Sequence, residues 1–132
     1  MAIKRMTKEG LRNSGVLNPV GHIILAFPEA VTGDAVAALH SAGFSAEDIL
    51  VYGAEEAAQR LRSRIESAGQ GAGFGYEITQ MRRFLGFAEE GCGWLVVYAP
   101  QDAQADRVVE VAERFGARCA VRYHLLANED LI

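Results

Sequence analysis

The sequence has few cysteines, little positive charge after its first residues and no long hydrophobic run, and each shortage excludes a class of protein. Two cysteines, Cys92 and Cys119, are too few for the disulfide framework of a small secreted domain, and they fit a reducing compartment. Hydrophobic runs such as residues 23–27 are far shorter than the roughly 20 residues that cross a bilayer. The basic first residues are not followed by the hydrophobic stretch of a secretory signal. We therefore expect a cytoplasmic protein that does not enter the membrane.

Positive charge is concentrated in the first twelve residues, which hold four of the 13 lysines and arginines. Residues 13–132 carry 9 basic and 16 acidic side chains, a net charge of −7 compared with −4 for the whole chain. Binding to nucleic acid depends on clustered positive charge that meets the phosphates. The acidic body of the chain therefore argues against nucleic acid as a partner.

The sequence also lacks a catalytic or cofactor-binding motif with a characteristic spacing. No serine has the glycine-flanked context of a nucleophile elbow, and neither cysteine has a neighbour in sequence that would activate its thiolate. Gly71, Gly73 and Gly75 follow a predicted helix, whereas a dinucleotide-binding loop follows a strand. We therefore predict no cofactor, no metal and no catalytic residue, and the sequence favours a non-catalytic role over an enzyme.

What the sequence does contain is a strand–helix–strand pattern that occurs twice. In residues 22–52 a hydrophobic strand stops at Pro28, and a helix and a second strand follow. Residues 94–124 repeat this order, with Pro100 at the matching position. Two right-handed β-α-β halves that share one sheet form a ferredoxin-like sandwich. We therefore predict an α+β fold with a four-stranded antiparallel sheet of order 4-1-3-2.

The first residues differ in character from the rest of the chain. Residues 1–19 are polar and have neither helical nor strand periodicity. We expect them to form a poorly ordered N-terminal arm, followed by a single domain over residues 20–132.

Residues 54–91 lie between the second and third predicted strands and form a helical insertion. Their hydrophobic residues recur at helical spacing, and residues 70–75 are expected to form a loop between two helices. Acidic residues flank the group of Arg60, Arg62 and Arg64 on both sides in sequence, so we interpret these arginines as part of a solvent-exposed helix face.

Alternation along the strands assigns side chains to the two faces of the sheet. The face under the two crossover helices is expected to hold Ile23, Leu25, Phe27, Leu50, Tyr52, Leu95, Val97, Cys119, Val121 and Tyr123. The opposite face is expected to hold His22, Ile24, Ala26, Ile49, Val51, Trp94, Val96, Tyr98, Arg122 and His124. An exposed face this hydrophobic marks an interface or a binding groove. We predict a homodimer through this open face; the alternative is that the insertion folds over it.

Five residues of the open face are the candidate ligand-binding residues: His22, Trp94, Tyr98, Arg122 and His124. We expect His22 and His124 to be cross-strand neighbours that could share a ligand, although a zinc site would need further ligands that the sequence does not place there. Trp94, Tyr98 and Arg122 fit either a pocket for a planar or anionic small molecule or the anchors of a dimer interface.

The same layout makes predictions about the two cysteines. If the first and last strands are antiparallel neighbours, Phe27 should lie close to Cys119. Cys92 should then lie at the opposite end of the sheet from Cys119, which excludes a disulfide between them.

Residues 38–51, ALHSAGFSAEDILV, resemble the opening β-α-β of the bacterial heat-induced general stress proteins, in which a helix ends in an Ala-Gly-aromatic step and a strand follows Asp-Ile. The later strand and the helix that closes on residues 115–117 are also similar, so the resemblance spans residues 22–124. The chain departs from that family in its middle, where members often carry a longer glycine-rich insertion.

The resemblance implies a small, stress-related bacterial protein without catalytic activity, which acts through homodimerisation or a partner at the open sheet face. The alternative is a small-molecule-binding or enzymatic domain with a pocket between that face and the helical insertion.

Overall fold

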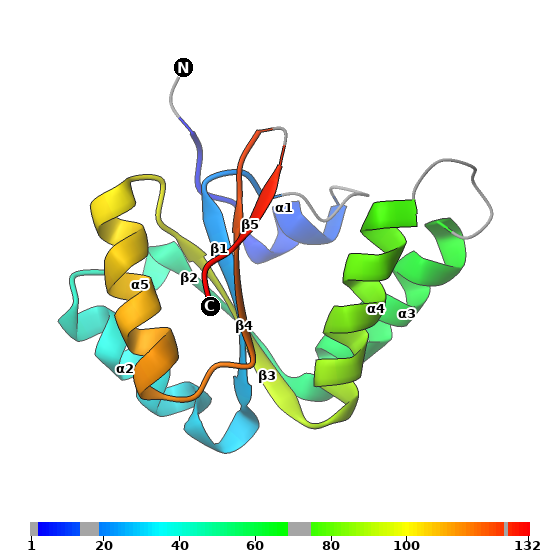
Figure 1. The fold of residues 1–132 in the computed structure, drawn as a ribbon, viewed down its shortest axis with the longest axis horizontal. Coiled ribbons are helices and arrows are strands. Elements are labelled where there is room, and N and C mark those ends of the chain that lie inside the picture. Colours follow the sequence, from blue (N-terminus) through cyan, green and yellow to red (C-terminus); the bar gives the residue numbers. More distant parts are fainter. Residues whose placement is uncertain (1–2, 14–18, 69–74, 126) are drawn as a thin grey trace.

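The computed structural model describes residues 3–13, 19–68, 75–125 and 127–132, and it is an α+β fold with one antiparallel sheet (Figure 1). The sheet has five strands in the order β2-β3-β1-β4-β5: β1 (His22–Pro28), β2 (Ile49–Tyr52), β3 (Cys92–Tyr98), β4 (Cys119–Tyr123) and β5 (Asn128–Asp130). The α-helices are α1 (Lys8–Asn13), α2 (Thr32–Ser41), α3 (Ala54–Ala68), α4 (Gly75–Glu89) and α5 (Asp102–Arg114). Helices α2 and α5 cover one face of the sheet, and α3 and α4 cover the other (Figure 1).

The four predicted strands lie in the predicted order, but the sheet is not four-stranded. Residues Asn128–Asp130 fold back along β4, so that Asp130 lies opposite Val121 and Asn128 opposite Tyr123. The sequence Asn-Glu-Asp has low β propensity and no hydrophobic alternation, so no sequence pattern indicated this strand. It forms where β4 would otherwise leave its backbone hydrogen-bonding groups unpaired at the edge of the sheet.

The core between the sheet and helices α2 and α5 follows the predicted alternation of β1 and β3. Ile23, Leu25 and Phe27 of β1 are fully buried here. They pack with two residues of β3 and with the hydrophobic stripes of both helices, namely Leu95, Val97, Ala35, Leu39, Val108 and Ala112. Each large aliphatic or aromatic side chain buried in this way contributes about 1.5–3 kcal/mol to the free energy of unfolding.

The opposite face of the sheet is not open, because the helical insertion packs on it. Ile24, Trp94 and Val96 of the sheet contact residues of α3 and α4, namely Ala57, Ala58, Leu61, Met81, Phe84 and Ala88. The rings of Phe84 and Trp94 meet edge to face, with 5.1 Å between their centroids. The predicted loop at residues 70–75 falls outside the described residues, except for Gly75, which begins α4. This packing removes the reason for expecting a second subunit on the face.

Strands β2 and β4 turn their side chains to the faces opposite to those predicted. Tyr52 and Val121 belong to the core under α3 and α4, whereas Ile49 belongs to the core under α2 and α5. The register explains the difference, because Trp94 lies opposite Tyr52, and residues directly opposite one another share a face. A change of register by one residue exchanges the faces of a whole strand.

The two cysteines lie at the same end of the sheet, so the prediction that they lie at opposite ends was wrong. Across β1, Cys92 lies opposite Pro28 and Cys119 lies opposite Ala26, not beside Phe27 as expected. Strands β3 and β4 are both antiparallel to β1, so both begin at this end. Because β1 separates them by two strand spacings, about 9–10 Å, the thiols cannot form a disulfide, and both are free.

At Gly93, strand β3 lies close to the start of α2 and to the residue Glu29, which follows β1. A Cβ atom at this position would lie 2.7 Å from Oγ1 of Thr32 at the start of α2 and 3.6 Å from Cα of Glu29. Glu29 is itself held in place, because its Oε2 accepts a 2.6 Å hydrogen bond from the backbone N–H of Ala54, the first residue of α3. Only a residue without a side chain fits here without displacing these groups.

We expect Gly93→Ala to lower the free energy of unfolding by about 1–3 kcal/mol, because the added methyl group overpacks this contact. Gly86→Ala in α4 is the matched control, since a Cβ there meets nothing within 4 Å. That control should be neutral or stabilising by up to about 1 kcal/mol, as alanine favours the helix over glycine. Urea denaturation of both variants measures the difference, and a Gly93→Ala variant as stable as the parent would contradict the contact.

Candidate functional site

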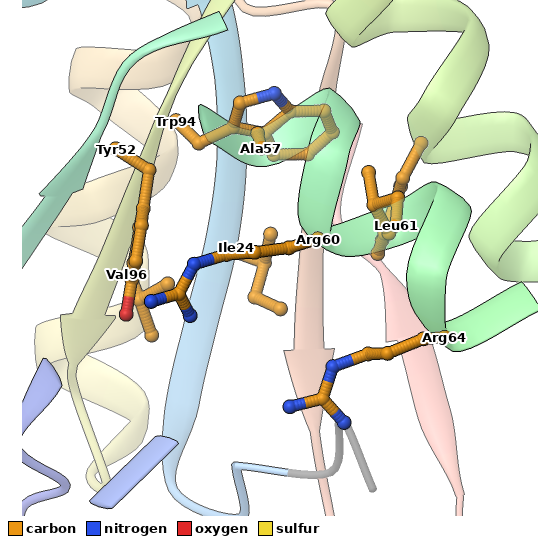
Figure 2. Close-up of a pocket in the computed structure, with 9 residues that line it drawn as sticks. Ile24, Tyr52, Ala57, Arg60, Leu61, Arg64, Trp94 and Val96 are labelled. Atoms are coloured by element: carbon orange, nitrogen blue, oxygen red, sulfur yellow. The ribbon is translucent and has the colours of Figure 1, made fainter. Parts of the chain in front are cut away.

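A pocket lies between the sheet and α3 (Figure 2). Strands β1, β2 and β3 and helices α3 and α4 supply its walls: Ile24, Tyr52, Trp94, Val96, Ala57, Arg60, Leu61, Arg64 and Phe84. Its volume is about 60 Å³, less than half of the roughly 150 Å³ cavity that takes up benzene. The pocket therefore has room for a small group, and not for a nucleotide or a larger cofactor.

Helical spacing brings the four α3 residues of the pocket to one face. Ala57, Leu61 and Arg64 are separated by four and three residues, and Arg60 is one turn before Arg64, so all four side chains leave the helix on the side toward the sheet. Arg62 lies between them in sequence but points elsewhere, and its Nη2 donates to Oε2 of Glu89 at 3.0 Å.

Two guanidinium groups border an otherwise hydrophobic pocket, and Figure 2 shows both extending from α3 toward the sheet. The Cζ atom of Arg60 lies 5.0 Å from the centroid of the Tyr52 ring, and its Nε lies 3.7 Å from Oε2 of Glu56. Burial lowers the pKa of Arg64, and the positive charge of Arg60 lowers it further, while Tyr52 acts in the opposite direction. The pocket thus holds two like charges close together in a partly dehydrated setting.

The N-terminal segment adds a third cation beside the same tyrosine. The Nζ atom of Lys8 lies 4.8 Å from the centroid of the Tyr52 ring and 3.3 Å from Oε1 of Glu56. The carboxylate of Glu56 is therefore shared between Lys8 and Arg60.

Of the five predicted ligand-binding residues, Trp94 lines this pocket and the other four do not. Its indole is 4 % exposed, and among the described residues its buried Nε1–H has no hydrogen-bond acceptor. His22 and Tyr98 lie on the same face of the sheet as Trp94, but beside the N-terminal segment.

His22 is buried and fastens the N-terminal segment to the sheet. Its Nε2 accepts a hydrogen bond from the backbone N–H of Met6 at 3.3 Å, and its Nδ1 lies 3.1 Å from the carbonyl oxygen of Val20. These two contacts require a neutral imidazole with its proton on Nδ1. Burial lowers the pKa of His22, although the carbonyl groups of Val20 and Pro19 and the charge of Asp48 oppose the shift.

Tyr98 also contacts the N-terminal segment, because its hydroxyl donates to the carbonyl of Ile3. Arg5 lies over the Tyr98 ring and forms a 2.6 Å ion pair with Asp48. Burial raises the pKa of the Asp48 carboxyl, but hydrogen bonds from Ser45 and the charge of Arg5 outweigh this effect and lower it overall. Residues 3–8 of the expected arm thus make specific contacts with the domain.

Arg122 lies on the face of β4 that is turned toward α5. It is opposite Ile23, a residue of the core under α2 and α5. Its Nη1 donates to Oδ1 of Asp102 at 2.8 Å and its Nη2 to the carbonyl of Pro100 at 3.2 Å, so the side chain holds the start of α5. The predicted shared face with Trp94 and Tyr98 was therefore wrong for Arg122.

The predicted pairing of His22 with His124 is not formed. The register that places Ile23 opposite Arg122 puts Tyr123 opposite His22, so His22 and His124 alternate to different faces. His124 is exposed, and its Nε2 lies 3.0 Å from Oε1 of Glu129 in β5. Across the described part of the chain, no group of three His, Cys, Asp or Glu side chains is placed to hold a metal ion.

The two cysteines carry thiols that could act as nucleophiles, and both are buried. Burial raises the pKa of the Cys92 thiol, and it raises the pKa of Cys119 to about 12. Neither thiol is activated as a nucleophile at neutral pH. No helix in the described ranges combines the length and hydrophobicity needed to span a bilayer.

Comparison with known proteins gives no relative: no family model, no curated protein and no solved structure matches this chain significantly. The resemblance to the heat-induced general stress proteins therefore remains an expectation based on residues 22–124.

The buried His22 predicts that stability decreases on acidification. His22 has an ordinary pKa near 6.5 in the unfolded chain and a lower pKa in the folded chain. At pH values between these two pKa values, the folded state therefore binds fewer protons than the unfolded state. The contribution of neutral His22 to the free energy of unfolding is fully present above about pH 6.5. It is lost as the pH falls toward the folded-state pKa, by up to about 1.4 kcal/mol per pH unit.

Urea unfolding between about pH 7.5 and pH 5 tests this. His22→Gln should remove this part of the decline, and His124→Gln, which changes an exposed imidazole, should retain it. An unchanged decline in His22→Gln would show that another group is responsible.

Proposed function

We propose that this protein is a non-catalytic domain that binds a small organic molecule in the pocket between the sheet and α3. The observation that supports the proposal is the lining of the pocket, where the buried rings of Tyr52, Phe84 and Trp94 meet the side chains of Arg60 and Arg64 (Figure 2). Hydrophobic walls with a few polar groups at one side are typical of small-molecule sites.

In this proposal the fold is a ferredoxin-like sandwich with an added edge strand. Its two β-α-β halves place both crossover helices, α2 and α5, on one face of the sheet. The other face carries the helical insertion, and α3 supplies the second wall of the site there.

The lining favours binding over catalysis. Of the described residues that line the pocket, none is a histidine, cysteine, aspartate or glutamate. Arginine stays protonated at neutral pH, so Arg60 and Arg64 can bind and orient a ligand but do not transfer protons. A stress-related role and a homodimer remain expectations from the sequence, since the described residues offer no observation that favours either.

The size of the pocket limits both the ligand and its affinity. The enclosed ligand portion of about three non-hydrogen atoms gains at most about 4.5 kcal/mol, at the ceiling of about 1.5 kcal/mol per atom. Dissociation constants are therefore expected in the millimolar range. Binding experiments must reach millimolar ligand concentrations.

Trp94 is the single tryptophan of the sequence, and it lines the pocket, so its fluorescence reports occupancy directly. We expect saturable changes in emission with short aliphatic compounds, such as isobutyrate and isobutyramide, at concentrations up to about 10 mM. Ala57→Leu fills the pocket and should weaken binding at least about tenfold, through steric exclusion of the ligand.

Ala54→Leu, at the first residue of the same helix and outside the pocket lining, is the matched control and should bind as the parent does. Leu61→Ala enlarges the pocket and should shift the preference toward larger compounds, such as benzoate and benzamide. Absence of any saturable change with the parent protein, or equal binding by Ala57→Leu, would refute the proposed function.

A further inference from the structure

We infer that the ligand of this pocket is a small organic carboxylate, held by Arg60 and Arg64 together, with its hydrophobic part against Tyr52 and Trp94. The inference rests on the proposed function, because it identifies the chemical class that the same pocket takes.

The spacing of the two arginines places their side chains on the same side of α3. Arg60 and Arg64 are four residues apart, so they leave α3 one above the other on the side that lines the pocket. Two like charges at this spacing disfavour the helix, and partial burial increases their repulsion. The lowered pKa of Arg64 is consistent with this, since burial and the charge of Arg60 both contribute to it. A bound anion would turn this repulsion into attraction.

Arg62, on the same helix but outside the pocket, has a close carboxylate partner. Arg62 on the outer side of α3 has a carboxylate oxygen of Glu89 at 3.0 Å. The carboxylate of Glu56 lies 3.7 Å from Nε of Arg60 and is shared with Lys8. Arg60 thus has a weaker ion pair than Arg62, although its side chain is less exposed, 23 % compared with 54 %.

The aromatic wall positions the guanidinium group for anion binding. The Arg60 guanidinium lies against the Tyr52 ring, which restricts its orientation and removes water from one side. A planar guanidinium matches a planar carboxylate with two parallel hydrogen bonds, and such bonds are stronger when partly dehydrated. The small volume of the pocket, about 60 Å³, favours a short carboxylate over a bulkier phosphate ester.

The test compares pairs of ligands of the same shape that differ in charge, using Trp94 fluorescence as the readout. Isobutyrate should bind at least about tenfold more tightly than isobutyramide, and propionate more tightly than propionamide. The advantage should shrink as the salt concentration rises from about 20 to about 500 mM, because salt screens the arginine charges.

Arg60→Gln and Arg64→Gln should each weaken isobutyrate binding about tenfold and change isobutyramide binding less than about twofold. Arg62→Gln, on the same helix but outside the pocket, is the matched control and should leave both unchanged. Arg60→Lys and Arg64→Lys keep the charge and should bind isobutyrate with intermediate affinity, which provides a second measurement if a glutamine variant fails to fold.

The outcomes separate the two proposals. Equal binding of isobutyrate and isobutyramide, both weakened by Ala57→Leu, would overturn the carboxylate inference and leave the pocket function intact. No binding of either would refute the pocket function itself. A loss with Arg62→Gln as large as with Arg60→Gln would overturn the inference by assigning the effect to overall charge. Displacement of isobutyrate by inorganic phosphate at lower concentrations than by propionate would overturn it in favour of a phosphate ligand.

Discussion

The constraint on which the structure depends is that β1 must be covered on both faces. All residues from His22 to Phe27 are at most 3 % exposed, and β3 and β4 flank the strand on either side. A strand that is hydrophobic at consecutive positions cannot leave one face in water. The crossover helices α2 and α5 cover the first face, and the helical insertion is the cover for the second. The insertion is therefore part of the core and not an appendage.

The pocket exists because α3 covers this face of the sheet incompletely. Where larger hydrophobic side chains would have closed the space above Ile24 and Val96, α3 presents Ala57 and two arginines. The alanine leaves volume, and the arginines border it without filling it, because their charged ends remain near water. Incomplete packing of this kind lowers stability and leaves the space that the proposed ligand would occupy, a combination common where function constrains a core.

Much of the fold could be predicted from the sequence, because its strongest patterns are local. Pro28 and Pro100 mark the ends of β1 and β3, and the alternation of Ile23 and Leu25 assigned that strand to the correct faces. Strand β4 reads Cys-Ala-Val-Arg-Tyr, in which hydrophobic residues on both faces hide the register, so its faces were reversed.

The site was harder to predict than the fold. Acidic residues flank Arg60 and Arg64 in sequence, which predicts a solvent-exposed helix face. The two arginines nevertheless lie beside the hydrophobic stripe formed by Ala57 and Leu61, and they therefore reach the sheet. The position of the two arginines beside that stripe predicts that they face the sheet, whereas the local amino-acid composition does not.

The acidic tail strand β5 has a consequence for self-association. Its three residues, Asn128–Asp130, occupy one border of the sheet and are too short and too negatively charged to recruit a further strand. Growth of the sheet is thereby confined to the β2 border. Two copies joined there across a twofold axis would use up both remaining borders, so pairing of this kind would end at a closed dimer.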